Sequence, residues 1–122
     1  MIRRVALALL VVSAVARTAD AQTADPAQLA LGGDLFRSRC AFCHGDGGRG
    51  DGPAGVTMIP RPPDFASAGF WRDADAARLR DAILNGVPGS AMMAYGGTLS
   101  AEQLDALLSY LEAFHRTAGA TP

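Results

Sequence analysis

Both cysteines of the chain and one of its two histidines lie in a single pentapeptide, Cys40-Ala41-Phe42-Cys43-His44. This C-x-x-C-H pattern is the attachment signature for c-type haem. Each thiol adds to one of the two vinyl groups of the porphyrin. The next histidine is carried beneath the ring, where neutral imidazole is a good iron ligand. The spacing therefore predicts one haem c, bound covalently by Cys40 and Cys43, with its iron held by His44.

Three other chemistries use paired cysteines. A thioredoxin-like C-x-x-C motif needs a βαβ setting, and no segment of this chain alternates like a strand. A zinc site would need His115 as a fourth ligand, whereas structural zinc sites draw on two separated ligand pairs. A disulfide between Cys40 and Cys43 would close too small a loop to stabilise much. Covalent haem is favoured over all three.

Haem iron needs a sixth ligand unless its site is open, and a methionine thioether paired with histidine raises the reduction potential. Met92 and Met93 follow His44 by about fifty residues and lie between two predicted helices. A loop at that position can cross the far face of the ring, so both are candidate ligands. Met58, in a proline-rich segment, is predicted to pack in the core. An open iron, as in a peroxidase-like or gas-binding protein, is the alternative.

Two helices are predicted on either side of this proline-rich segment. The first, residues 27–40, has an irregular apolar face interrupted by Gly32, which indicates that another backbone approaches closely. The second, residues 73–85, has Asp73 as its expected N-cap and Gly86 just past its end. The haem motif thus follows directly after the first helix.

A last helix is predicted over residues 100–116, where Ser100 and Gln103 form a capping box. Residues 45–69 and 87–99 are rich in glycine and proline and are predicted to be loops. The domain is therefore expected to be all-α, with three main helices. Such a chain has little core of its own and needs a large apolar guest. The expected buried stripe of the last helix is Leu104, Leu107, Leu108, Leu111 and Phe114.

Residues 1–21 combine a basic start, an apolar run and an Ala-Asp-Ala sequence before Gln22, which predicts a secretory signal peptide cut after Ala21. The rest, residues 22–122, is expected to form one domain. Of the 11 basic and 12 acidic residues of the chain, eight basic and eleven acidic residues remain after the cut. Every basic residue is arginine. Nucleic acid is a poor partner for this mildly acidic surface. Export predicts a periplasmic protein.

Over the whole predicted domain, the chain resembles the class I, single-haem bacterial cytochromes c. In that family a glycine and an aromatic residue, eight and four residues before the first haem cysteine, pack against the last helix. Gly32 and Phe36 stand at these positions, and Leu107 and Tyr110 match their partners. The resemblance implies a cytochrome c-like fold wrapped around one haem.

The resemblance also implies roles around the iron. The segment containing Met92 resembles the one that delivers the distal methionine, usually written Met-Pro, so Met92 is implied as the sixth ligand. Met93 stands where proline is expected, which leaves the loop without the fixed φ of proline. A carbonyl of Pro60 or Pro62 is implied to accept a hydrogen bond from the imidazole of His44.

The function implied is that of an exported electron carrier rather than an enzyme in its own right. Its donor and acceptor would be other redox proteins. The chain would act either as a free shuttle or as the haem subunit of a dehydrogenase or oxidase complex, with docking to a membrane complex possible. Trp71 and Tyr95 are candidate contacts to the haem or its propionates, with core packing as the alternative role.

Overall fold

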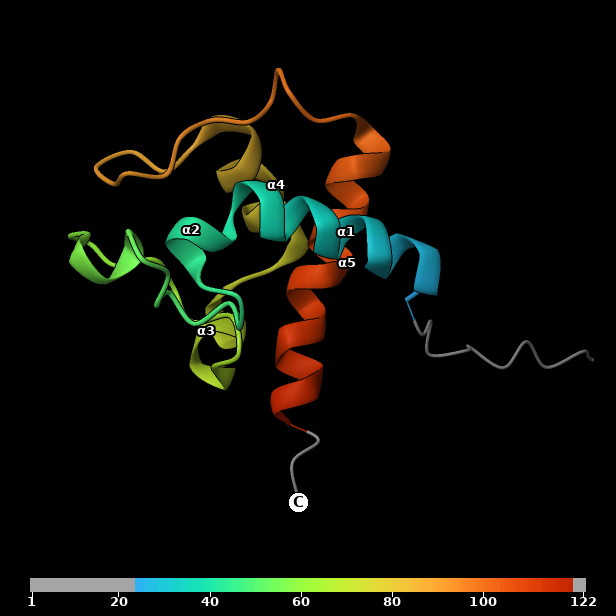
Figure 1. The fold of residues 1–122 in the computed structure, drawn as a ribbon, viewed down its shortest axis with the longest axis horizontal. Coiled ribbons are helices and arrows are strands. Elements are labelled where there is room, and N and C mark those ends of the chain that lie inside the picture. The colour runs from blue at the N-terminus through green and yellow to red at the C-terminus, as the bar shows by residue number, and fades with distance from the viewer. Residues whose placement is uncertain (1–23, 120–122) are drawn as a thin grey trace, which may run out of the picture.

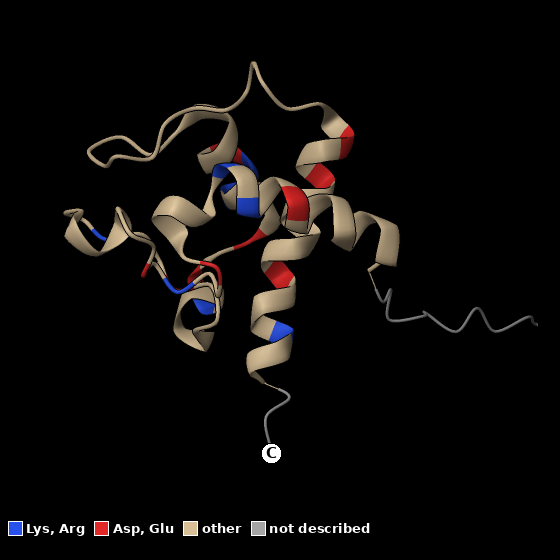
Figure 2. Cartoon of the chain, in the orientation of Figure 1, with Lys and Arg blue, Asp and Glu red and all other residues tan. Residues whose placement is uncertain are grey.

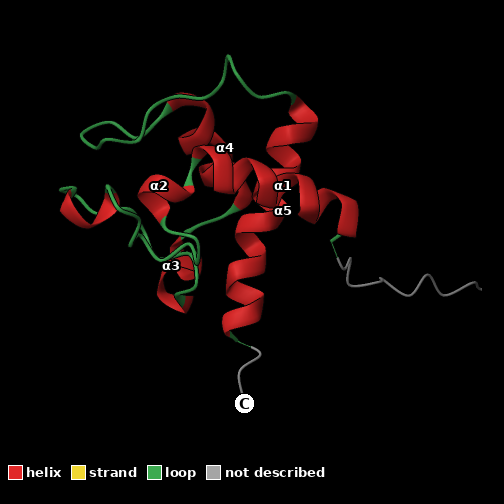
Figure 3. Ribbon diagram, viewed as in Figure 1, coloured by secondary structure: helices red, strands yellow, loops and turns green. Residues whose placement is uncertain are grey.

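The structure, a computed structural model, describes residues 24–119. The predicted signal peptide therefore lies outside the described residues. Within them every regular element is helical and none is a strand (Figure 3), which confirms the all-α prediction. The elements are α1 (Pro26–Arg39), α2 (Ala41–His44), the 3₁₀ turn η1 (Gly55–Thr57), α3 (Ala68–Asp73), α4 (Ala76–Asn85) and α5 (Ala101–Ala118).

The first and last long helices, α1 and α5, cross in the middle of the molecule (Figure 1). Gly32 of α1 lies at this crossing, where a Cβ atom would collide with the backbone carbonyl of Ala106. Four residues later, Phe36 is fully buried, and its ring packs against Tyr110 with centroids 5.5 Å apart. The predicted close approach is confirmed, with Leu107 buried beside it.

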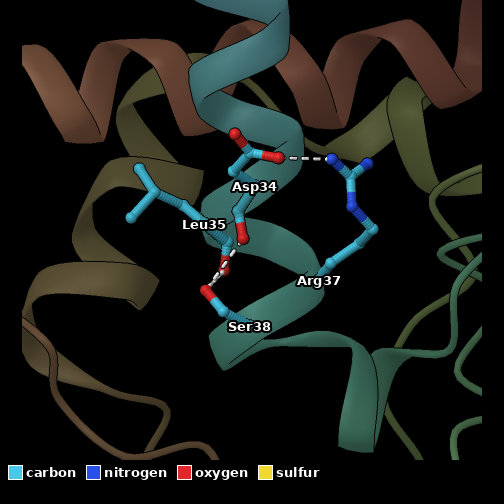
Figure 4. Close-up of polar contacts among 4 residues, drawn as sticks. All are labelled: Asp34, Leu35, Arg37 and Ser38. Atoms are coloured by element: carbon cyan, nitrogen blue, oxygen red, sulfur yellow. Dashed lines mark hydrogen bonds and ion pairs between the residues drawn. The ribbon is translucent and has the colours of Figure 1, made fainter.

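The outer face of α1 carries only surface interactions (Figure 4). Arg37 donates to the carboxylate of Asp34 at 2.5 Å, and both side chains are exposed. The hydroxyl of Ser38 donates to the carbonyls of Asp34 and Leu35, at 2.8 and 3.2 Å. Exposed ion pairs stabilise by only ~0–1 kcal/mol. The position of α1 therefore depends on its buried face and not on these contacts.

The start of α4 differs from the sequence prediction. Asp73, the expected N-cap, is instead the last residue of the short helix α3, which the sequence did not predict and which begins inside the predicted loop over 45–69. Asp75 caps α4, because its carboxylate accepts the backbone N–H of Arg78 at 2.8 Å. A helix as short as α3 gives too few apolar repeats to be recognised by periodicity. The end is as predicted, with Gly86 at φ +76°.

The capping box of α5 is confirmed. The hydroxyl of Ser100 accepts the N–H of Gln103 at 3.1 Å, and the Gln103 side chain accepts the N–H of Ser100 at 2.9 Å. The four leucines of its predicted stripe are buried and Phe114 is half-buried. Basic and acidic residues both lie on its outer surface (Figure 2). None of the helices described is long and apolar enough to cross a membrane.

Candidate haem-binding site

A cavity of about 420 Å³ opens between the haem motif, the proline-rich loop, α4 and the loop after α4. Ligand pockets in proteins typically enclose ~300–1,000 Å³. Four residues that the sequence singled out lie in its wall, although they come from two segments about fifty residues apart: Cys40, Cys43, His44 and Met92. The fold thus brings together the predicted attachment sites and both predicted ligands.

The wall of the cavity is mainly apolar. Leu79 and Ile83 of α4 face it from one side, and Leu107 and Leu111 of α5 form its floor. All four are also buried members of the core. The cavity is thus continuous with the hydrophobic core, and no aspartate or glutamate lines it among the residues described. Such a wall suits the faces of a large aromatic macrocycle.

The two thiols are free. Cys40 and Cys43 are half-buried and form no disulfide. Burial raises the pKa of Cys40 to about 11, with a further increase from Cys43 and an opposing effect of Arg39. Without a bound metal, its sulfur is therefore a neutral thiol at pH 7. His115, the fourth ligand of the zinc alternative, lies elsewhere: its ring stacks on Trp71 with centroids 5.8 Å apart.

His44 is the last residue of α2, and its burial lowers the pKa of the imidazole. The neutral form, which can bind iron, is therefore favoured. Its Nδ1 atom is buried and has no hydrogen-bond partner among the residues described. The expected hydrogen bond to a carbonyl of Pro60 or Pro62 is thus not formed. Instead, the Pro62 carbonyl lies so close to Gly50 that a Cβ there would collide with it.

Both methionines of the Met-Met pair line the cavity, but they differ in burial. Met92 is half-buried and packs against the core, whereas Met93 is 65 % exposed. The loop is pinned at Met92, whose carbonyl accepts the N–H of Val87 and whose N–H donates to the hydroxyl of Ser90, both at 3.1 Å. Met58 lines the cavity but does not belong to the hydrophobic core cluster, so its prediction as a core residue was wrong.

Of the two aromatic candidates, only Tyr95 lines the cavity. Its hydroxyl donates to the carbonyl of Arg39 at 3.4 Å, and burial raises its pKa, with smaller contributions from the two cysteines. Trp71 does not line the cavity. Its indole N–H donates to the carbonyl of Phe65 at 2.6 Å and its ring packs edge-on against Phe70, so it lies behind two residues of the wall.

Three arginines that sequence reasoning did not assign also line the cavity. Arg39 donates to the carbonyl of Thr98 at 3.1 Å and Arg78 to that of Asp73 at 3.0 Å. Arg61 makes no hydrogen bond or ion pair with the residues described, and it is exposed. Only Arg39, directly before Cys40, was detectable in the sequence, because the other two are brought to the cavity by the fold.

These residues fit a haem. Two free thiols can take up the vinyl groups, a neutral imidazole and a thioether can take the two axial positions, and the apolar wall can cover the faces of the ring. The arginines supply the only positive charges in the described wall, where the two propionate carboxylates of a haem need partners. No feature of the wall opposes this cofactor.

Comparisons with known proteins agree with this fit. The family described as cytochrome c oxidase, cbb3-type, subunit III, matches residues 27–111. The fold is similar to a chain of the reducing HAO-like protein complex of Kuenenia stuttgartiensis, with a TM-score of 0.61 and 25% identity. That match covers 75% of this chain and 44% of the other, so the chain spans less than half the length of its structural neighbour. No curated protein sequence matches significantly.

Proposed function

Because this chain belongs to the cytochrome c family described as cbb3-type oxidase subunit III, it is a haem c electron-transfer protein, and we propose that His44 and Met92 are its axial ligands. The observation that carries this proposal is the cavity that joins the C-x-x-C-H motif to Met92, with an apolar wall between them. When bound, the haem supplies an iron that alternates between the Fe(II) and Fe(III) states.

The residues of the chain have separate tasks in this proposal. The sulfurs of Cys40 and Cys43 hold the cofactor in a domain too small to enclose it fully. The Nε2 atom of His44 and the thioether of Met92 would hold the iron, and with both bound, small ligands would be kept away from the metal. A thioether ligand favours the reduced state and raises the reduction potential. Arg61 is the proposed partner of a propionate, because it is otherwise uncommitted among the described residues.

An open-site haem protein is a second candidate, and one observation favours it. Met93 stands in place of the expected proline and is mostly exposed, so it can compete with Met92 or leave the iron open. Carbon monoxide distinguishes the two functions. Added to the reduced protein at neutral pH, it should leave the visible spectrum unchanged if Met92 is bound. Rapid formation of a carbonyl spectrum would instead support a gas-binding or peroxidase-like site.

We further propose that the chain works in the periplasm and meets its partners through an apolar rim. Phe42, inside the haem motif, is 68 % exposed, and Met93 is 65 % exposed at the cavity wall. The similarity to a chain of a multiprotein haem complex supports a role in such a complex, while a free shuttle remains the simpler form.

Mass spectrometry of the protein from a periplasmic fraction tests the location. A mature chain should begin at Gln22, and retention of residues 1–21 in the cytoplasm would contradict the periplasmic location.

A further inference from the structure

We propose that Phe65, held in place by Trp71, sets the ring plane of the His44 imidazole. Phe65 is then a positioning residue, since it acts on the iron only through His44. This inference deepens the proposed function and rests on His44 as a haem ligand. It concerns the orientation of that ligand rather than its identity.

The contact between the two rings carries the proposal. The imidazole of His44 and the phenyl ring of Phe65 stack with centroids 5.0 Å apart and an interplanar angle of 19°. Phe65 is 5 % exposed, so solvent does not separate the rings. A second ring, that of Phe36, is more distant, at 6.4 Å, and tilted by 51°. The nearly parallel neighbour, Phe65, therefore restricts the imidazole plane most directly.

The plane of a metal-binding imidazole is usually fixed by a hydrogen bond. A metal-binding histidine commonly donates its second ring N–H to a carboxylate, carbonyl or water, which fixes the orientation of the ring. In this chain the Nδ1 atom of His44 is buried without such a partner among the described residues. Rotation about the bond from Cβ to the ring is thus opposed by packing, and the stacked ring of Phe65 is the main obstacle.

Phe65 can act as a fixed wall because its backbone is anchored on both sides. Its N–H donates to the carbonyl of Gly48 at 2.8 Å, in the glycine-rich loop that follows His44. Its carbonyl accepts the indole N–H of Trp71 at 2.6 Å. The phenyl ring also packs edge-on against Phe70, with centroids 5.2 Å apart. Movement of Phe65 would therefore break contacts with both the loop and α3.

The orientation of an axial imidazole has a direct spectroscopic consequence. In low-spin Fe(III), the angle of the imidazole plane to the porphyrin nitrogens selects the iron d orbital that holds the unpaired electron. The unpaired spin then spreads unevenly over the four pyrroles. Proton NMR of the oxidised protein reports this distribution as the order and spread of the shifted haem-methyl resonances. The readout depends on ring orientation and not on overall stability.

The test compares Phe65→Leu with Phe70→Leu in the oxidised haem protein. Phe70 is a matched control, since it lines the same cavity and contacts Phe65 but makes no ring contact with His44. We expect Phe65→Leu to change the order or spread of the haem-methyl resonances and Phe65→Tyr to restore them. Phe70→Leu, which alters the same cavity wall and loosens Phe65 without removing the ring stacked on His44, should change them less. An unchanged pattern in Phe65→Leu, or an equal change in Phe70→Leu, would overturn the proposal.

A second variant covers the case in which Phe65→Leu does not yield folded protein. Trp71→Phe removes the indole donor to the Phe65 carbonyl while it keeps an aromatic ring beside Phe70 and His115. It should move the same resonances in the same direction by a smaller amount, and an unchanged pattern would contradict the role given to Trp71. Failure of the proposed function gives a different result from failure of this inference. In that case the wild-type protein itself would lack a low-spin, histidine-bound haem.

Discussion

Gly32 of α1 lies directly against the backbone carbonyl of Ala106 in α5, with no room for a side chain between the two helices. This contact fixes where α1 ends relative to α5. Cys40 follows immediately after α1, and Leu107 and Leu111 of α5 form the floor of the cavity. The helix crossing therefore sets the distance between the first attachment sulfur and the surface on which the ring rests.

Replacing Gly32 by alanine should destabilise the protein, because the new methyl group meets backbone that cannot move aside. Overpacking of this kind typically costs ~1–3 kcal/mol, and occasionally more. The free energy of unfolding of the haem protein, from denaturant titration, measures it. Gly97→Ala is the control, since nothing lies within 4 Å of a Cβ at that position. A Gly32→Ala variant as stable as the control would show that the helices can separate without loss.

Replacing both Cys40 and Cys43 by serine should leave the chain largely unfolded. Without the attached haem, the apolar wall of a cavity of about 420 Å³ faces water instead of the cofactor. A domain with so small a core of its own has little other apolar burial to offset this loss. Circular dichroism during heating should show low helicity and no cooperative transition. Native-like helicity with a sharp transition would mean that the core is sufficient without the cofactor.

Sequence patterns predicted the long helices and the motif because these depend on local spacing. The capping box at Ser100 and Gln103 is an example. The close approach at Gly32 joins distant segments, but a glycine inside a helix is a local sign of it. Contacts between distant segments that leave no such local sign were not predictable. Arg61 and Met58 lie in a loop with no periodicity, and only the folded chain brings them to the cavity. The N-cap of α4 is Asp75 and not Asp73, because the short helix α3 ends at Asp73. Its six residues show too few apolar repeats to be recognised as a helix in the sequence.

Neutralising Arg61 should lower the reduction potential. A positive charge beside the haem disfavours the extra positive charge of Fe(III), so its removal in Arg61→Gln stabilises the oxidised form. One such charge is worth on the order of 1 kcal/mol, which corresponds to tens of millivolts. Potentiometric titration measures the difference. Arg49→Gln is the control, because Arg49 is exposed and does not line the cavity. Equal potentials for the Arg61 variant and the wild type would remove Arg61 from the set of propionate partners.

The two methionines should respond differently to truncation. Met92→Ala removes the half-buried thioether. The oxidised haem should then change from low spin to high spin, or its iron should bind a different sixth ligand. Met93→Ala removes a mostly exposed side chain and should retain the low-spin spectrum. Electron paramagnetic resonance of the two oxidised variants measures their spin states. The opposite pattern would assign the sixth ligand to Met93.

The most direct test of the account is the visible spectrum of the protein, exported in a host with haem-attachment machinery, first oxidised and then reduced with dithionite. We expect the sharp reduced bands of a low-spin c-type haem, together with the weak far-red band of a thioether bound to Fe(III) in the oxidised form. A haem spectrum without that far-red band would contradict ligation by His44 and Met92. The absence of any covalently bound haem would contradict the account as a whole.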